Sequence, residues 1–181
     1  ETYTIDGLDV RASIEKFVNL PSGELEGVKL VKGHMPFGLH RYIASPTAYV
    51  TFLREPVERV ISYYYYVRRS PSHYLHQKVV RNNLSLQGFV EARLTTEVYD
   101  FQTKLIAGVE SELHRWEYDH SLLEKAVTNL DRYFSVVGVS ELFDESLLLM
   151  KYSLGWHFWP FYRKQNVTKG RAKIDRLPDN T

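Results

Sequence analysis

The stretch YVTFLREPVERVISYYYY, residues 49–66, decides the fold assignment. Its first five residues are uncharged and mostly β-branched or aromatic, which predicts a strand buried on both faces, as in a parallel sheet. Pro56 then stands where proline is preferred, in the first turn of a helix. Apolar side chains recur at helical spacing from Val57 onward. Residues 49–69 therefore predict a strand, a sharp turn and a helix.

The rest of the chain repeats this alternation of strands and helices. Residues 28–31 and 134–139 predict two more strands. Helices are predicted at 85–94, at 97–107, from a capping box at Ser121 to about Leu130, and at 141–154. The alternation predicts an α/β fold with a central, mostly parallel sheet flanked by helices. The length of 181 residues suits a single domain over residues 1–181.

Composition excludes several classes of protein. The chain has no cysteine, so it holds no disulfide framework, no cysteine-ligated metal and no thiol nucleophile. No apolar run reaches the roughly 18–20 residues of a membrane helix. The net charge is +1, which disfavours a general nucleic-acid-binding protein. Any anion site must therefore come from the local placement of charge.

The segment around Arg54 offers such a placement. Ligands of open α/β sheets bind at the carboxyl ends of strands, where Arg54 is predicted to lie. The helix that follows presents free N–H groups, and Arg59 and Ser62 share one of its faces. Together these groups predict a phosphate-sized anion site. The alternative is that Arg54 pairs with Glu55 or Glu58 at the surface and that Ser62 faces solvent.

The pattern Arg54-x-Pro56-x-x-Arg59-x-x-Ser62-x-Tyr64 resembles the 3′-phosphate-binding motif of sulfotransferases that use 3′-phosphoadenosine 5′-phosphosulfate (PAPS). It looks most like carbohydrate sulfotransferases related to heparan sulfate 2-O-sulfotransferase and their bacterial relatives. The resemblance implies a P-loop-NTPase-like fold, PAPS as donor, 3′-phosphoadenosine 5′-phosphate (PAP) as product, and no metal. It implies that Arg54 and Ser62 hold the 3′-phosphate, with Arg59 assisting or bracing the loop.

Two further stretches resemble the same family. Residues 133–149 resemble its late strand and helix, and residues 166–171 resemble a basic loop that closes over the nucleotide. The resemblance implies that Lys169, Gly170 and Arg171 close the nucleotide site, within a basic loop over residues 163–176. A solvated loop is the alternative for this segment.

The resemblance also indicates a catalytic base. The family places a histidine in a Gly-His pair upstream of the arginine motif, which implies that His34 deprotonates the acceptor hydroxyl. His40 is the second choice, or lines the acceptor cleft. Residues 100–104 resemble a segment near the acceptor, so Gln102 and Thr103 are expected to touch substrate. The alternative for His34 is a histidine that satisfies backbone groups at a strand end. The alternative for Gln102 and Thr103 is an exposed helix face.

One family element is missing from the sequence. No strand followed by a Pro-Lys-x-Gly-Gly-Thr-type loop occurs, and we expect the sequence to begin after that element. A degenerate family member that lacks the loop is the alternative. The function expected is sulfuryl transfer to a hydroxyl, with carbohydrate as the favoured acceptor. A non-catalytic nucleotide- or polyanion-binding module is the alternative. The segment from Gly33 to Gly38 lacks the lysine and hydroxyl of a Walker loop, which argues against an ATPase. A P-loop kinase-like phosphotransferase is a second alternative.

Two expectations concern the setting of the protein. The lack of cysteine favours a cytoplasmic, bacterial-type location over the Golgi lumen. The partner expected is a hydroxyl acceptor, and no nucleic acid is expected. A second copy of the chain is a further candidate partner, because family members can be oligomers.

Overall fold

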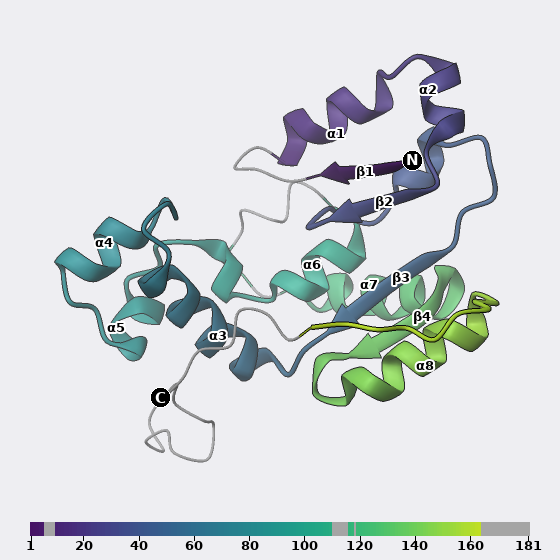
Figure 1. Cartoon of the computed structure of the whole chain (residues 1–181). Helices are drawn as coiled ribbons and strands as arrows, with labels where there is room; N and C mark the ends of the chain where they lie inside the picture. Colours follow the sequence, from purple (N-terminus) through teal and green to yellow (C-terminus); the bar gives the residue numbers. More distant parts are fainter. Residues whose placement is uncertain (6–9, 110–115, 118, 164–181) are drawn as a thin grey trace. The chain divides into compact units, whose positions relative to one another are not determined.

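The computed structural model describes residues 1–5, 10–109, 116–117 and 119–163 (Figure 1). Strands and helices alternate along these residues, so the predicted α/β class is confirmed. The chain divides into two compact units. The first comprises Glu1–Tyr49 and Phe101–Phe134, and the second comprises Val50–Asp100 and Ser135–Thr181. The single domain over residues 1–181 stays a prediction.

The first unit begins with two parallel strands joined through helices. Strand β1 (Thr2–Ile5) pairs in parallel with β2 (Leu30–Gly33), with α1 (Val10–Val18) and α2 (Ser22–Gly27) between them in sequence. Helix α1 lies along this pair of strands (Figure 1). Ile5 of β1 and Phe17 of α1 are fully buried and form a core with Leu39. A βαβ-like arrangement thus places the end of β2 at the start of the segment that holds His34.

The first unit also contains α6 (Phe101–Ala107), α7 (His120–Tyr133) and the short 3-10 helix η1 (Leu39–Tyr42). Asn129 of α7 is buried, and its amide donates to the carbonyl oxygen of Ile106 at 2.8 Å. This bond satisfies a carbonyl that the end of α6 would otherwise leave unpaired. The amide of Phe37 donates to the carbonyl oxygen of Leu105 at 2.7 Å, which ties the segment after His34 to α6.

Gly108 lets the end of α6 lie close to the backbone of Phe37. Its replacement gives a prediction about stability. Its φ is +69°, and a Cβ there would overlap the carbonyl oxygen of Phe37. We expect Gly108→Ala to lower the free energy of unfolding by about 2–4 kcal/mol, because strain and overlap add. Gly23→Ala is the matched control, since a Cβ there meets nothing within 4 Å. Thermal unfolding checks the pair, and an equal loss in both variants would contradict this packing.

The second unit is built on strands β3 (Tyr49–Leu53) and β4 (Phe134–Val139), which pair with each other. The first residue of each strand, Tyr49 in β3 and Phe134 in β4, belongs to the first unit. The 3-10 helix η4 (Ser140–Leu142) and helix α8 (Phe143–Ser153) follow β4. Ser146 of α8 is buried, and its hydroxyl bonds to both the N–H and the carbonyl of Val139. These bonds fix α8 against the end of β4.

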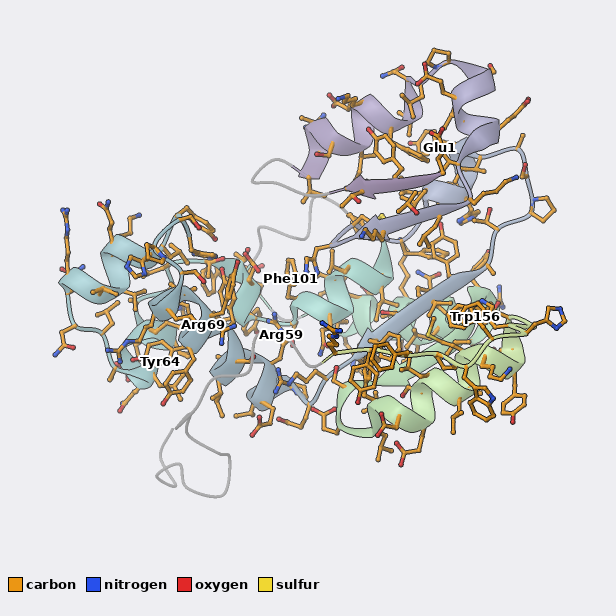
Figure 2. All side chains as sticks on the ribbon, in the orientation of Figure 1. Glu1, Arg59, Tyr64, Arg69, Phe101 and Trp156 are labelled. Carbon is orange, nitrogen blue, oxygen red and sulfur yellow. The ribbon has the colours of Figure 1, made fainter. Side chains whose placement is uncertain are left out.

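Helix α3 (Pro56–Arg69) leads into α4 (His76–Arg81), α5 (Leu86–Glu91) and the 3-10 helix η2 (Thr96–Val98). Tyr64 is buried, and its hydroxyl donates to the carbonyl oxygen of Leu84 at 2.7 Å. Side chains fill the space between these helices (Figure 2). The core of this part consists of five buried residues: Tyr64, Val67, Leu75, Val79 and Phe89.

Three sequence predictions differ from the structure. The described strands form two separate two-stranded sheets in place of one central sheet, because periodicity predicts a strand but does not encode its ladder partner. The helix predicted at 97–107 is broken at Asp100, whose φ is +48°. Helix α7 is capped by Asp119, which accepts from the amide of Ser121, and not by a Ser121 capping box. The P-loop-NTPase-like fold stays a prediction.

Candidate functional site

The turn between β3 and α3 places Arg54 where the sequence predicts it. Arg54 follows the last residue of β3, and α3 begins two residues later at Pro56. The side chain of Glu55 caps the helix by accepting from the amide of Glu58 at 2.6 Å. Because this carboxylate takes one of the free N–H groups of the first turn, the helix start offers an anion fewer donors than the sequence suggests.

Two carboxylates flank the guanidinium of Arg54. Its Nη2 lies 3.5 Å from Oε2 of Glu58, and its Nε lies 3.7 Å from Oε1 of Glu141. The alternative pairing with Glu58 is therefore present in the structure. Both distances are longer than the roughly 2.7–2.9 Å of a charge-assisted hydrogen bond. At these distances the two contacts are weaker than charge-assisted hydrogen bonds.

Ser62 and Arg59 lie on the face of α3 that the sequence predicts for them, but they differ in environment. Ser62 is half-buried, and its hydroxyl makes no hydrogen bond within the described ranges. Arg59 donates from Nη2 to the backbone carbonyl of Glu97 in η2. Burial lowers the pKa of Arg59, and the nearby Glu97 carboxylate opposes that shift. This contact shows Arg59 bracing η2, and the binding of a ligand by Ser62 stays a prediction.

The acidic neighbours of Arg54 give a prediction about affinity. If a phosphate binds Arg54, Glu141 competes with it, so Glu141→Gln should tighten PAP binding up to about fivefold, the range of an exposed ion pair. The amide of glutamine still accepts the bond from the N–H of Glu55 that Glu141 receives at 3.3 Å. Calorimetric titration with PAP measures the change. Glu145→Gln, an exposed change on α8, is the control and should leave the affinity unaltered; weaker binding in Glu141→Gln would contradict the competition.

His34 lies in the first unit, directly after the end of β2, as predicted. Its side chain is exposed. Gly33 precedes it with φ +151°, and a Cβ at Gly33 would overlap the carbonyl oxygen of Ile5. The backbone at the end of β2 therefore adopts a conformation that only glycine allows, and this conformation sets the position of His34.

His40 has a different environment from His34. Its backbone N–H and its Nδ1 each lie 2.9 Å from the hydroxyl of Tyr49. Its ring stacks on Tyr133 with centroids 5.4 Å apart, and it packs against Phe37. Burial raises the pKa of the Tyr49 phenol, which keeps this hydroxyl protonated. The structure thus shows His40 as a member of an aromatic cluster, and its contact with substrate stays a prediction.

The remaining predicted site residues fall in two groups. Gln102 and Thr103 lie on α6 of the first unit and are half-buried. Lys169, Gly170 and Arg171 lie outside the described residues, as does most of the loop predicted over residues 163–176. His34, His40, Gln102 and Thr103 thus belong to the first unit, and Arg54, Arg59 and Ser62 belong to the second.

Sequence reasoning missed two acidic residues of the second unit. Glu141 contacts Arg54, and its signal was its position just after β4, the strand that pairs with β3. Glu97 accepts hydrogen bonds from two tyrosines and a backbone bond from Arg59, and no spacing in the sequence indicated this role. Within the described part of the chain, no group of three or more His, Asp or Glu side chains is arranged to hold a metal.

The comparisons with known proteins show a similarity to one class of enzyme. No family model matches the chain. The chain is similar to a carbohydrate sulfotransferase, which confirms the predicted resemblance at the level of that class. The relative is galactose-3-O-sulfotransferase 3 of Homo sapiens, which is 29% identical over 156 residues, or 77% of the chain. The match covers 33% of the relative, so the chain spans about a third of its length. The narrower likeness to heparan sulfate 2-O-sulfotransferase is not shown.

This relative corrects one expectation and weakens another. The preference for a cytoplasmic, bacterial-type location is wrong, because the relative is a human sulfotransferase of the Golgi type. The absence of cysteine gave a wrong prediction of location, because a domain of this size can be stable without disulfides. The comparison does not favour a non-catalytic binding module. Among the described helices, none combines the length and apolar character that crossing a bilayer requires.

Proposed function

We propose that the chain binds PAPS and takes part in transferring its sulfuryl group to a hydroxyl of a galactose-containing carbohydrate. The observation that carries the proposal is the placement of Arg54 after β3 and of Ser62 on α3, in a chain similar to a carbohydrate sulfotransferase. The galactose acceptor is suggested by the name of the relative.

The donor side of the proposal rests on the second unit. The guanidinium of Arg54 and the hydroxyl of Ser62 are the donor types that bind a phosphate in proteins. Both lie on the β3–α3 segment, whose first helical turn also contributes a positive dipole end. Arg59 holds η2 and so keeps the neighbouring face of α3 in place. Lys169, Gly170 and Arg171 would close over the nucleotide.

The reaction is a displacement at sulfur. The acceptor oxygen attacks the sulfur of PAPS and forms a new sulfur–oxygen bond. The bond from sulfur to the 5′-phosphate oxygen breaks, and PAP leaves with that electron pair. His34 takes the proton that the acceptor hydroxyl loses, which is the role of a general base. Protein donors around the phosphates stabilise the charge that develops on the leaving group.

A transfer assay tests the proposed function. The chain is incubated with PAPS carrying labelled sulfate and with N-acetyllactosamine, whose terminal sugar is galactose. We expect a sulfated disaccharide, detected by mass spectrometry, in an amount that grows with enzyme concentration. ATP with magnesium serves as the control donor and should give no phosphorylated product. A chain that binds PAP but forms no sulfated product would overturn the proposal and favour the binding module.

A further inference from the structure

We propose that an aromatic surface on the second unit, formed by Tyr66, His73 and Tyr74 beside Glu97, binds a neutral pyranose of the acceptor carbohydrate. This inference rests on the proposed function and deepens it by assigning acceptor contacts to residues that the sequence motifs leave out. The surface is called the tyrosine–histidine surface below.

The rings of this surface hold one another at defined angles. His73 stacks on Tyr74, with centroids 4.7 Å apart and 28° between the planes. Tyr66 meets the same histidine edge-on at 5.5 Å and 85°. The ring of Tyr66 therefore stands nearly perpendicular to the ring of His73. Tyr66 and Tyr74 are 41% and 47% exposed, so both rings are accessible to a ligand.

Hydrogen bonds fix the polar edge of the surface. Tyr63 donates to Oε1 of Glu97 at 3.0 Å, and the hydroxyl of Tyr74 lies 3.5 Å from the same oxygen and 3.2 Å from Oγ1 of Thr95. Burial and the Glu97 carboxylate raise the pKa of Tyr63, so this phenol stays protonated and donates. Within the described residues, Oε2 of Glu97 accepts no hydrogen bond, and it remains an acceptor for a ligand hydroxyl.

The protonation state of His73 is consistent with a neutral surface. Burial lowers the pKa of His73, and its Nδ1 accepts from the amide of Leu75 at 3.2 Å. A neutral imidazole is the form that accepts at one nitrogen. Burial thus favours the neutral form of the His73 imidazole, although the Glu97 carboxylate opposes this shift.

Charge argues for a neutral polyol as the ligand. Aromatic rings beside a carboxylate could also bind a cation. Two arginines oppose a cation here, because Arg69 lies over the ring of Tyr66 at 5.6 Å and Arg59 contacts Glu97. Both arginines project from α3 (Figure 2). A pyranose combines an apolar face, which stacks on a ring, with hydroxyls that a carboxylate accepts, and so it matches this set of groups.

The position along α3 connects the surface to the donor site. Ser62 and Tyr66 are four residues apart on one helix, which places them on one face and about 6 Å apart along the axis. A ligand on the tyrosine–histidine surface would thus lie about one helical turn beyond the proposed phosphate-binding serine.

Saturation-transfer NMR with N-acetyllactosamine tests the inference. We expect signals on the galactose ring with the wild-type chain, and an affinity about tenfold lower in Tyr74→Ala, the usual loss for an aromatic anchor. Glu97→Gln keeps the shape of the side chain and should also weaken binding. Tyr152→Ala is the matched control, because Tyr152 is 73% exposed on α8 of the same unit. PAP affinity, measured separately by calorimetry, should stay unchanged in all variants.

The outcomes separate this inference from the proposed function. Wild-type PAP binding without galactoside binding, or galactoside binding that is equal in Tyr74→Ala and Tyr152→Ala, overturns the surface and leaves the donor site standing. A loss of PAP affinity in Tyr74→Ala also overturns it, because the surface would then belong to the nucleotide. If the wild-type chain does not bind PAP, the proposed donor site is overturned, whether or not the galactoside binds.

Discussion

Arg54→Ala is expected to weaken PAP binding about 100-fold, the largest effect on affinity that the structure predicts. Hydrogen bonds to charged groups contribute about 1.5–3 kcal/mol each, and a guanidinium can make two of them with one phosphate. Loss of this fork removes the main positive group that the sequence motif directs at the 3′-phosphate. Arg54→Lys keeps the charge but not the forked geometry of the guanidinium. Its affinity for PAP should therefore lie between those of the wild type and Arg54→Ala, about tenfold below the wild type.

Controls separate the loss of a ligand contact from a loss of fold. Arg81→Ala removes an exposed arginine from α4 of the same unit and should bind PAP like the wild type. Ser62→Ala removes one uncharged donor and should weaken binding less than Arg54→Ala. Circular dichroism and the melting temperature confirm the fold of each variant. Equal PAP affinities in Arg54→Ala and Arg81→Ala would show that Arg54 is only a partner of Glu58 and Glu141.

His34→Ala is expected to lower the rate of sulfuryl transfer by about 10²–10⁴, the contribution of a general base, with PAP affinity unchanged. His34 is exposed at the end of β2, so the replacement should not alter the fold. A lower rate at an unchanged PAP affinity and an unchanged melting temperature is the result that a general base predicts and that a structural histidine does not.

Two other histidines serve as comparisons for His34. His157→Ala removes an exposed histidine of the second unit and should leave the rate unchanged. His40→Ala removes the contact of Nδ1 with the Tyr49 hydroxyl and the stack on Tyr133, so it should lower the melting temperature. Assays of initial rate at saturating PAPS measure all three variants. A rate for His34→Ala equal to that of His157→Ala would exclude His34 as the base.

Local patterns in the sequence predicted the elements with the clearest periodicity. Strands β3 and β4 were predicted at the residues where they occur, because uncharged β-branched runs have few other structures available. Helix α3 was predicted from Pro56 and its apolar spacing. The burial of Tyr64 followed from the same spacing, because one face of an amphipathic helix must pack inward.

Other features depended on contacts that no local pattern encodes. Strand β1 and helix α1 lie in a stretch for which the sequence analysis predicts no element, although Val10, Ile14 and Phe17 have helical spacing that could have indicated α1. The division into two strand pairs depends on which backbones bond to one another. The left-handed conformation of Asp100 broke a predicted helix that its composition alone would allow.

The candidate site shows the same limit. The motif predicted Arg54, Arg59 and Ser62 from residues close in sequence, and the structure places them on one strand–helix segment. Glu141 lies 86 residues from Glu55 in sequence, yet it accepts the N–H of Glu55 and contacts Arg54. Long-range contacts of this kind set the electrostatics of the site, and they appear only when the chain is folded.

If the β3–α3 segment holds a nucleotide 3′-phosphate, the chain must distinguish PAP from 5′-AMP, which lacks that group. Calorimetric titration of the wild-type chain with both nucleotides measures this difference. We expect micromolar PAP binding and a much weaker binding of 5′-AMP, with the difference lost in Arg54→Ala. Equal affinities for the two nucleotides, or no heat with either, would rule out this phosphate site.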